Sequence, residues 1–452
     1  MSTLLHPRLP LAADETALSW AARLAAAHTG GRVAGFLRDM DIDRDAFLRG
    51  EEAALARLAR LGGEPFERVA AAAIRRGEDG LLRLRGQRFS HGFTTEPATV
   101  FCPRCLADDD AAGDAPAVAR RGRLIWKLRP VRVCPEHRVA LIRRAPVRWE
   151  DKFHEIAVRV PERGDTLARL AEEAVEAAPS PLQDYVVARL AGRAGPAWLD
   201  GQTVEQGVLA SEWLGLTLAF GPLLDPERLL TEADHDEAAR VGFHYTARGE
   251  AGVRDALAEL RARPVRAGGR IGAQAVFGVL YQRLQYTRSD RDPGPIRDVL
   301  REVILETMEV AAGTDLLGEV VETRRLHTVA SLAKQARQNH HTLRNFLVAK
   351  GLVPAVETGP LPAVMYADAA EAAIAGLRRT VSVVGLRDLL NCSRPMAEQI
   401  VATGLLEPVA GAAAARSGNK RCSVDRAQVD RFLGRLSEAA PEVAVAPDGY
   451  VP

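Results

Sequence analysis

Aromatic residues are scarce in this chain, since Phe, Trp and Tyr together make up 5% of its 452 residues. Long apolar runs are missing as well, because no stretch approaches the roughly 18 uninterrupted apolar residues of a membrane-spanning helix. Residues 1–15 lack the basic start, apolar run and cleavage site of a secretion signal. We therefore expect neither a membrane protein nor a secreted one.

Cysteine is also rare. The five cysteines are too few for a disulfide framework in a chain of this length. Their scarcity favours a reducing, cytoplasmic setting, in which clustered cysteines bind metal more often than they form disulfides. We expect a cytoplasmic protein.

A large excess of charge of either sign is absent. The chain has 60 Lys and Arg against 59 Asp and Glu, a formal net charge of +1. This balance excludes a uniformly basic, histone-like binder of nucleic acid, but it is compatible with local basic patches. The length and the globular composition predict a folded protein of several domains.

Ala, Leu, Arg and Glu dominate long stretches, and a mainly helical protein is therefore expected. Asp14 is the expected N-cap of an amphipathic helix over 15–26, because apolar residues follow it at helical spacing. Short apolar runs at 124–133 and 139–147 predict small strands. No repeat of fixed period is evident. Further helices are expected at 33–40, 51–63, 166–178, 182–192, 210–221 and 296–313.

The strongest motif consists of two short pairs of metal ligands. Cys102 and Cys105 are separated by two residues in FCPRCL. Cys134 and His137 have the same separation in VCPEHR, and 28 residues lie between the pairs. Two intervening residues let a tight turn aim both side chains at one ion, so two such turns complete a tetrahedral site. Because four protein ligands leave no open position, we expect one structural Zn²⁺, whose binding can contribute about 10–16 kcal/mol to folding.

The alternative interpretation treats CPRC as a thioredoxin-like redox pair and CPEH as a coincidence. No βαβ pattern surrounds CPRC, and the second matched pair would then be unexplained. The metal site is therefore preferred. Cys392 and Cys422 lack matching partners, and His91 and His154, which flank the motif, are not assigned as ligands.

The segment from Arg120 to Arg148 is strongly basic. It contains ten Lys and Arg and one acidic residue, Glu136, which makes a net charge of +9 over 29 residues. Such a local field suits phosphates, so we predict contact with nucleic acid or with an acidic protein surface. The alternative is a solvated face, or a surface that pairs with acids elsewhere in the chain. The residues assigned here to nucleic-acid contact are Arg120, Arg121, Arg123, Lys127, Arg129, Arg132, Arg143 and Arg144.

Residues 328–353 have the apolar pattern of a helix-turn-helix. Val329 begins one apolar stripe, and a second stripe follows a polar break at 338–340. The second helix is expected to expose side chains that bond to base edges and phosphates. The residues assigned to DNA contact on it are His341, Arg344 and Asn345.

A related pattern occupies 381–408, with Met396 expected in the core of the helix pair. A basic turn, a short strand and a closing helix follow over 416–436, an order that resembles excisionase-like and MerR-like winged-helix modules. Any short pair of helices has similar apolar stripes, so a plain helical pair is the alternative for both segments. The residues assigned to DNA contact here are Arg394, Gln399, Arg416, Lys420 and Arg421.

No residues form a recognisable catalytic constellation. The chain has neither a G-x-S-x-G elbow nor the Lys-Ser/Thr of a phosphate-binding loop. The run from Asp108 to Asp110 is interpreted as a solvated loop of the metal module. We expect no enzymatic activity.

Taken together, these residues resemble the TniQ family of transposon-encoded accessory proteins. The opening LPLAADETALSWAARLA carries Pro10, Glu15, Ser19, Trp20 and Arg23, which fit the family's first helix. The resemblance is most specific at FCPRCL and LIWKLRPVRVCPEHRVAL, whose metal ligands fall on the family's zinc pattern. The match covers about residues 8–150, and it weakens beyond them.

The resemblance implies a role in DNA transposition, beside a TniA-like transposase and a TniB-like AAA+ ATPase. Family members help to choose or mark the target site, and related members attach to CRISPR effector complexes. Their N-terminal helices form a helix-turn-helix-like unit fused to zinc-binding modules. The resemblance therefore implies DNA, the ATPase and the transposase as partners, with a second copy of the chain as a further candidate.

We expect a non-enzymatic, DNA-associated adaptor in transposition that helps to select the target site. The alternative is a DNA-binding transcriptional regulator that acts through its C-terminal helix-turn-helix units. The expected fold is mainly α and multidomain, with a small zinc-binding module and C-terminal helix-turn-helix and winged-helix-like units. Its expected parts are an N-terminal helical TniQ region (1–90), the zinc-binding module (91–150), a helical middle domain (151–322), a helix-turn-helix (323–366), a winged-helix-like unit (367–440) and a tail (441–452).

Overall fold

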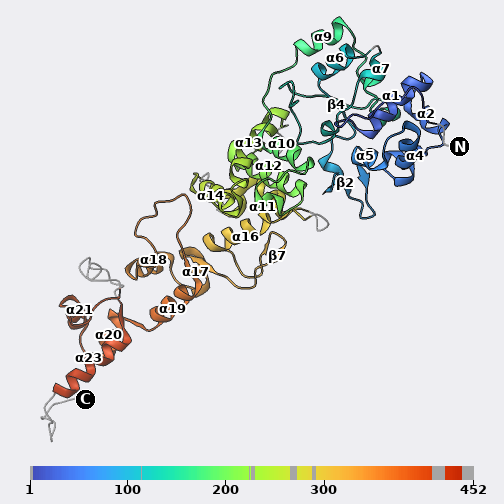
Figure 1. The fold of residues 1–452 in the computed structure, drawn as a ribbon. Coiled ribbons are helices and arrows are strands. Elements are labelled where there is room, and N and C mark those ends of the chain that lie inside the picture. The colour runs from blue at the N-terminus through green and yellow to red at the C-terminus, as the bar shows by residue number, and fades with distance from the viewer. Residues whose placement is uncertain are drawn as a thin grey trace, which may run out of the picture. The chain divides into compact units, whose positions relative to one another are not determined.

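The computed structural model describes residues 4–113, 115–222, 224, 230–264, 272–287, 292–409 and 423–439. The chain divides into two compact units, Met1–Leu260 with Gln274–Leu300, and Arg261–Ala273 with Arg301–Pro452. The described residues are mainly helical, as the composition predicts (Figure 1). Within these ranges, no helix combines the length and the apolar character needed to cross a membrane. The predicted tail at 441–452 lies outside the described residues.

The first unit begins with a group of short helices around one apolar core. Its first helix starts at Ala17, and the Thr16 hydroxyl accepts the backbone N–H of Ser19 at 3.0 Å, so Thr16 and not Asp14 is the N-cap. The Trp20 side chain is fully buried, and its indole N–H donates to the carbonyl of Leu9 at 2.8 Å. The helices of this group are α1 (Ala17–Thr29), α2 (Val33–Asp39), α3 (Arg44–Leu48), α4 (Glu52–Gly62) and α5 (Phe66–Ala71).

Short strands and tight helical turns connect this group to the metal-ligand pairs. In the predicted strand at 124–133, residues Leu124–Lys127 form a 3-10 turn, because Trp126 donates its backbone N–H to the carbonyl of Arg123 at 3.1 Å. The strand predicted at 139–147 is confirmed in its centre. The elements are β1 (Arg75–Arg76), β2 (Leu82–Leu84), β3 (Gln87–Phe89), η1 (His91–Phe93), β4 (Thr99–Phe101), α6 (Pro103–Ala111), α7 (Pro116–Ala119), η2 (Leu124–Lys127), β5 (Ile142–Arg144) and η3 (Trp149–Phe153).

Three of these strands form one antiparallel sheet in the order β1-β2-β3, and β4 pairs with β5 with Val100 opposite Arg143. Apolar side chains of this region, including Phe101 and Trp126, share a core with Leu182 and Val208 from later helices. The described residues on either side of position 150 therefore pack into one body. The domain boundaries predicted within this unit stay predictions.

Helices dominate the described residues from 156 to 307. Helices α12 and α13 approach each other closely, because Gly215 and Gly242 face the partner backbone and a Cβ on Gly215 would lie 1.8 Å from the carbonyl oxygen of Ala238. The helices are α8 (Ile156–Arg159), α9 (Asp165–Glu172), α10 (Pro181–Leu190), α11 (Ala197–Asp200), α12 (Val204–Phe220), α13 (Glu232–Thr246), α14 (Gly249–Ala262), α15 (Ala273–Gln285) and α16 (Ile296–Thr307).

The second unit combines short strand pairs with helices. The predicted apolar stripes are confirmed at Leu332 and Leu343, which are buried, but wrong at Met396, whose 56% exposure places it outside the core. The elements are β6 (Asp315–Leu316), β7 (Glu319–Val320), β8 (Leu326–Thr328), α17 (Val329–Ala336), α18 (His340–Ala349), β9 (Val364–Tyr366), α19 (Ala367–Arg378), β10 (Thr380–Ser382), α20 (Val383–Leu389), α21 (Arg394–Ala402), β11 (Ser423–Asp425) and α23 (Arg426–Ala439).

Candidate metal centre

The four predicted ligands converge on one point. One ligand atom from each of Cys102, Cys105, Cys134 and His137 lies within 4.8 Å of the others. The Cys105 sulfur is 3.5 Å from the Cys134 sulfur and 3.3 Å from His137 Nδ1. A tetrahedral ion with metal–sulfur bonds of about 2.3 Å and a metal–nitrogen bond of about 2.0 Å would hold its donors about 3.5–3.8 Å apart. The spacing therefore fits one metal ion, as the motif predicts.

The first ligand pair lies where strand β4 passes into helix α6. Cys102 occupies the N-cap position, and its sulfur accepts the backbone N–H of Cys105 at 3.5 Å. Pro103 is the first helical residue, a position in which the missing N–H of proline costs nothing. The helix start therefore aims both sulfurs to the same side.

The second pair lies on a tight turn. The Cys134 backbone N–H donates to the carbonyl of Val139 at 2.8 Å, and the Arg138 N–H donates to the carbonyl of Cys134 at 2.9 Å. Arg138 adopts a left-handed conformation with φ of 52°. This turn brings the His137 imidazole back over the Cys134 sulfur, with Nδ1 and the sulfur 3.7 Å apart.

Asp108 on helix α6 orients the histidine. His137 Nε2 lies 2.8 Å from a carboxylate oxygen of Asp108. An imidazole that carries its proton on Nε2, beside this carboxylate, would turn the lone pair of Nδ1 toward the three sulfurs. A carboxylate behind a ligating imidazole is a common outer partner in metal sites, where it holds the ring and raises its basicity.

The electrostatics of the thiols also favour a cation. Hydrogen bonds with Cys102 and Cys134, followed by burial, raise the pKa of the Cys105 thiol well above its usual range. Contacts with Cys102 and Cys105 lower the pKa of Cys134 to about 2. One thiolate is thus favoured, and the other thiols resist ionisation beside it. A bound divalent cation would remove this conflict, because coordinated thiols are deprotonated.

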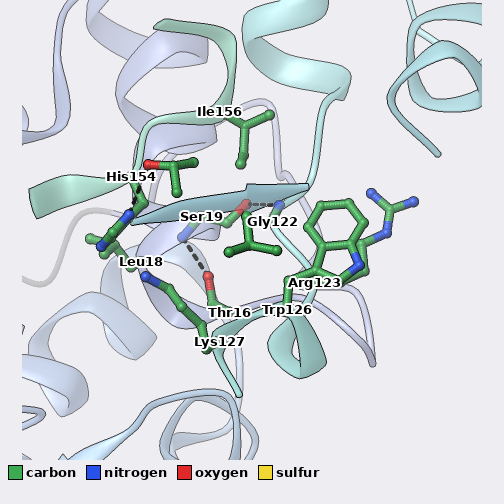
Figure 2. Close-up of a pocket in the computed structure, with 11 residues that line it drawn as sticks. Thr16, Leu18, Ser19, Gly122, Arg123, Trp126, Lys127, His154 and Ile156 are labelled. Atoms are coloured by element: carbon green, nitrogen blue, oxygen red, sulfur yellow. Dashed lines mark hydrogen bonds between the residues drawn. The ribbon is translucent and has the colours of Figure 1, made fainter. Parts of the chain in front are cut away.

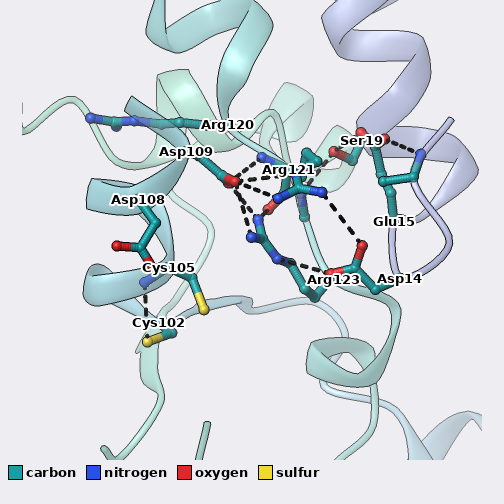
Figure 3. A network of polar contacts seen from close by, with 12 residues as sticks. Asp14, Glu15, Ser19, Cys102, Cys105, Asp108, Asp109, Arg120, Arg121 and Arg123 are labelled. Carbon is teal, nitrogen blue, oxygen red and sulfur yellow. Dashed lines mark hydrogen bonds and ion pairs between the residues drawn. The ribbon is translucent and has the colours of Figure 1, made fainter. Parts of the chain in front are cut away.

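Asp109, the next residue of α6, binds two arginines of the basic segment (Figure 3). Its side chain is 2% exposed, and Oδ1 accepts from Arg121 Nη2 at 2.9 Å and from Arg123 Nη2 at 3.0 Å. Arg123 Nε also lies 3.2 Å from the carboxylate of Asp14, just before helix α1. The helix that carries the metal ligands is therefore tied to the start of the N-terminal helices.

Asp110 completes the acidic run by pairing with Arg120, whose side chain is fully buried. The two arginine nitrogens Nε and Nη2 donate to the two oxygens of this carboxylate at 2.7 and 2.6 Å. The interpretation of Asp108 to Asp110 as a solvated loop is therefore wrong. The sequence carried one usable signal, since the run begins three residues after Cys105 and Pro103 suits the first position of a helix.

Five more basic residues of the segment, all of them assigned to nucleic-acid contact, also meet carboxylates of this chain. Arg132, with a side chain 4% exposed, pairs with Glu212 at 2.8 Å and with Glu232 at 3.0 Å. These contacts agree with the alternative given above, in which the basic segment pairs with acidic residues elsewhere in the chain. Whether any of the residues also meets nucleic acid stays a prediction. The other pairs are Lys127 with Glu96, Arg129 with Glu212, Arg143 with Glu232 and Arg144 with Glu162.

A buried hydroxyl, imidazole and carboxylate lie in a row beside strand β4. His154 Nδ1 is 3.0 Å from the hydroxyl of Thr99, and His154 Nε2 is 2.8 Å from Glu96. Triad hydrolases use the same order of groups. Thr99, however, is 2% exposed, and its hydroxyl accepts from Arg159 Nε at 3.3 Å. The row therefore stabilises the fold and does not present a nucleophile.

A small cavity lies next to this row (Figure 2). Thr16, Ser19, Lys127 and His154 are among its lining residues, and its volume of about 20 Å³ has room for one water molecule. Such a cavity is too small for a substrate.

The candidate DNA-contact residues of the second unit lie on its short helices. His341 and Asn345 on α18 and Gln399 on α21 are exposed. Arg344 is engaged with its own chain, through the carbonyl of Ala355 at 2.9 Å. Three more assigned residues lie outside the described ranges, namely Arg416, Lys420 and Arg421.

Residues 6–141 match the TniQ family model. This range includes all four converging donors and the arginines that bind Asp109 and Asp110. No curated protein matches the chain. The resemblance drawn from the sequence is confirmed over this range, and residues 6–141 form a TniQ domain.

Proposed function

We propose that this chain is a non-enzymatic, DNA-associated adaptor in DNA transposition. It would help to select or mark the target site together with an AAA+ ATPase and a transposase. The observation that carries the proposal is the TniQ match over residues 6–141, a range that contains the four converging donors.

The proposed ion is a structural Zn²⁺. Three thiols and one imidazole are the donor set that tetrahedral zinc prefers, and four protein ligands leave no position for a substrate. When bound, the ion supplies a fixed cross-link and no reaction chemistry. Cys102 and Cys105 would then anchor helix α6, and its acids would hold the basic segment against the N-terminal helices.

We assign the DNA contact to the second unit, whose short helix pairs we interpret as helix-turn-helix modules. The arginines assigned to nucleic-acid contact from Arg120 to Arg144 pair with carboxylates of the same chain, so little of their charge is available to phosphates. Within the described part of the chain, the exposed side chains of His341 and Asn345 on α18 form no ion pair with a carboxylate. His341 and Asn345 can reach base edges there.

The test is co-purification of the full chain with TniA-like and TniB-like proteins from the same genome. The proposal predicts a complex with the ATPase and an insertion pattern that depends on this chain. A matched Cys105→Ser variant, which lacks one metal ligand, is expected to lose both. Specific binding to a promoter, with no ATPase bound and no effect on insertion, would contradict the proposal and support a transcriptional regulator.

A further inference from the structure

The second unit contains the same arrangement of elements twice. The first repeat (residues 326–378) runs β8, α17, α18, β9 and α19, and the second repeat (residues 380–439) runs β10, α20, α21, β11 and α23. Strand β8 pairs antiparallel with β9, and β10 pairs antiparallel with β11. In each repeat the strand pair encloses two short helices, and a longer helix follows. No repeat of fixed period in the sequence indicates this duplication.

Details of the backbone recur at matching positions. The hydroxyls of Thr328 and Ser382 cap the first helix of each repeat, each accepting a backbone N–H three residues on at 3.1 Å. The turns between the helices contain Arg337 and Asn391, both in the left-handed conformation with φ of 54° and 46°. These equivalent positions are 54 residues apart.

The cores of the two repeats match as well. After the second helix the offset changes to 53 residues, and Gly351 and Gly404 end the two helix pairs with φ of 71° and 79°. For the last strand and helix the offset is 59 residues, as between Met365 and Val424, so no single spacing reveals the period. The equivalent buried pairs are Leu332 and Leu386, Leu343 and Ala397, Leu347 and Val401, Val353 and Leu406, Met365 and Val424, and Ala370 and Val429.

The charges of the two helix pairs differ. Residues 328–353 of the first repeat contain four Lys and Arg and no acidic residue. Residues 382–406 of the second repeat contain two arginines and two acidic residues. The same backbone therefore carries a net charge of +4 in one copy and zero in the other.

Ion pairs sharpen this difference. In the second repeat, Arg387 pairs with Asp388 at 2.8 Å and Arg394 pairs with Glu398 at 2.9 Å. In the first repeat, Arg344 pairs with Glu357 at 3.6 Å.

The other cations of the first helix pair remain uncompensated. Lys334 and Arg337 are exposed, and neither forms an ion pair with a carboxylate in the described part of the chain. The first turns of α18 and α21 both lack acids, so the helix dipoles do not distinguish the two repeats.

We propose that duplex DNA binds to the helix pair of the first repeat and not to that of the second. Lys334 and Arg337 supply uncompensated charge for phosphates, and His341 and Asn345 present donors and acceptors to base edges in the major groove. The inference rests on the proposed DNA contact and narrows it to one of two copies. It concerns the helix pairs and not residues 410–422.

Matched variants of the full chain test the inference. In the first repeat, Arg337→Asn with Asn345→Asp lowers the charge by two. In the second repeat, Asn391→Asp with Gln399→Glu lowers it by two at the equivalent positions. All four residues are exposed, and each left-handed position keeps a residue type that tolerates this conformation. Zinc content and thermal midpoint, measured for both variants, verify that each remains folded.

The measurement is binding to a mixed-sequence DNA duplex over a series of salt concentrations. We expect the first-repeat variant to bind about tenfold more weakly and its log–log salt slope to shrink by about 1, since phosphate contacts are lost. The second-repeat variant is expected to bind within about twofold of the unmodified chain.

Equal losses, a loss in the second repeat alone, or no loss in either variant would overturn the inference while the chain still binds DNA. Failure of the unmodified chain to bind any duplex would instead remove the DNA contact from the proposed function.

Discussion

Replacing Asp109 with Asn tests the link between the metal-bearing helix and the basic segment. The substitution keeps the size of the side chain but removes its charge and turns one acceptor into a donor. Oδ1 of Asp109 now accepts from Arg121 and from Arg123, and Oδ2 pairs with Arg123 Nη1. An asparagine amide would face these N–H groups with N–H groups of its own.

The size of the effect follows from burial. Breaking a buried ion pair by removing one partner costs about 3–5 kcal/mol, because the remaining charge stays desolvated. The Arg123 side chain is 7% exposed and keeps a contact to Asp14, whereas the Arg121 side chain is 33% exposed and can reach water. We therefore expect a loss near the lower end, about 3 kcal/mol. For a cooperative unit of this size, this corresponds to a fall in the melting midpoint of about 5 °C.

The assay is thermal unfolding of the zinc-loaded full chain, followed by tryptophan fluorescence. Trp20 and Trp126 are buried on the two sides of the link and report on it directly. The matched control is Asp255→Asn, which breaks an exposed pair with Arg248 and is expected to leave the midpoint nearly unchanged. If the Asp109→Asn variant had the same melting midpoint as the Asp255→Asn control, the reasoning would be refuted.

Three further predictions concern the same unit. Asp108→Asn is expected to weaken zinc binding about 10–100-fold in competition with a chromophoric chelator, because the imidazole loses its outer partner; unchanged affinity would show that the contact is incidental. Burial, followed by repulsion from Lys127, lowers the pKa of His154 below 6.5 in the folded state. Below pH 6.5 the unfolded chain binds more protons than the folded chain, so the free energy of unfolding decreases as the pH falls. In the His154→Gln variant, the urea midpoint should therefore depend less on pH below 6.5. Gly215→Ala should destabilise the chain by about 1–3 kcal/mol or more in urea unfolding, since its Cβ would collide with the Ala238 carbonyl; a midpoint equal to that of the unmodified chain would contradict the close helix contact.

The metal ligands could be predicted from the sequence because their geometry is local. Two residues between ligands are enough to form each turn, and only the meeting of two turns depends on the fold. The contacts of Asp108 with His137 and of Asp109 with Arg121 could not be predicted from the sequence. They arise because residues 103–111 form a helix whose side chains meet residues of other segments.

The ion-pair partners of the basic segment could not be predicted for a different reason. Its partners lie far along the chain, as Glu212 and Glu232 do for Arg132. Local charge counts cannot detect such pairing, because it arises when separate elements pack together. The segment therefore has the charge of a phosphate-binding surface, but many of its arginines form ion pairs with carboxylates of the same chain.

The duplication in the second unit escaped detection because its signals are mostly conformational. Caps, left-handed turn residues and buried positions recur, but few residue identities do, and the offset between equivalent residues changes along the repeat. Met396 also illustrates the limit of periodicity, since helical spacing alone placed it in the core and the structure exposes it.

Zinc stoichiometry is the most direct measure of whether three thiolates and an imidazole organise the TniQ domain. Elemental analysis of the full chain, purified from zinc-replete medium, is predicted to find one zinc per chain. The double variant Cys105→Ser and Cys134→Ser should contain none and should unfold at a lower temperature. Absence of metal from the unmodified protein, or full retention in the double variant, would contradict the account.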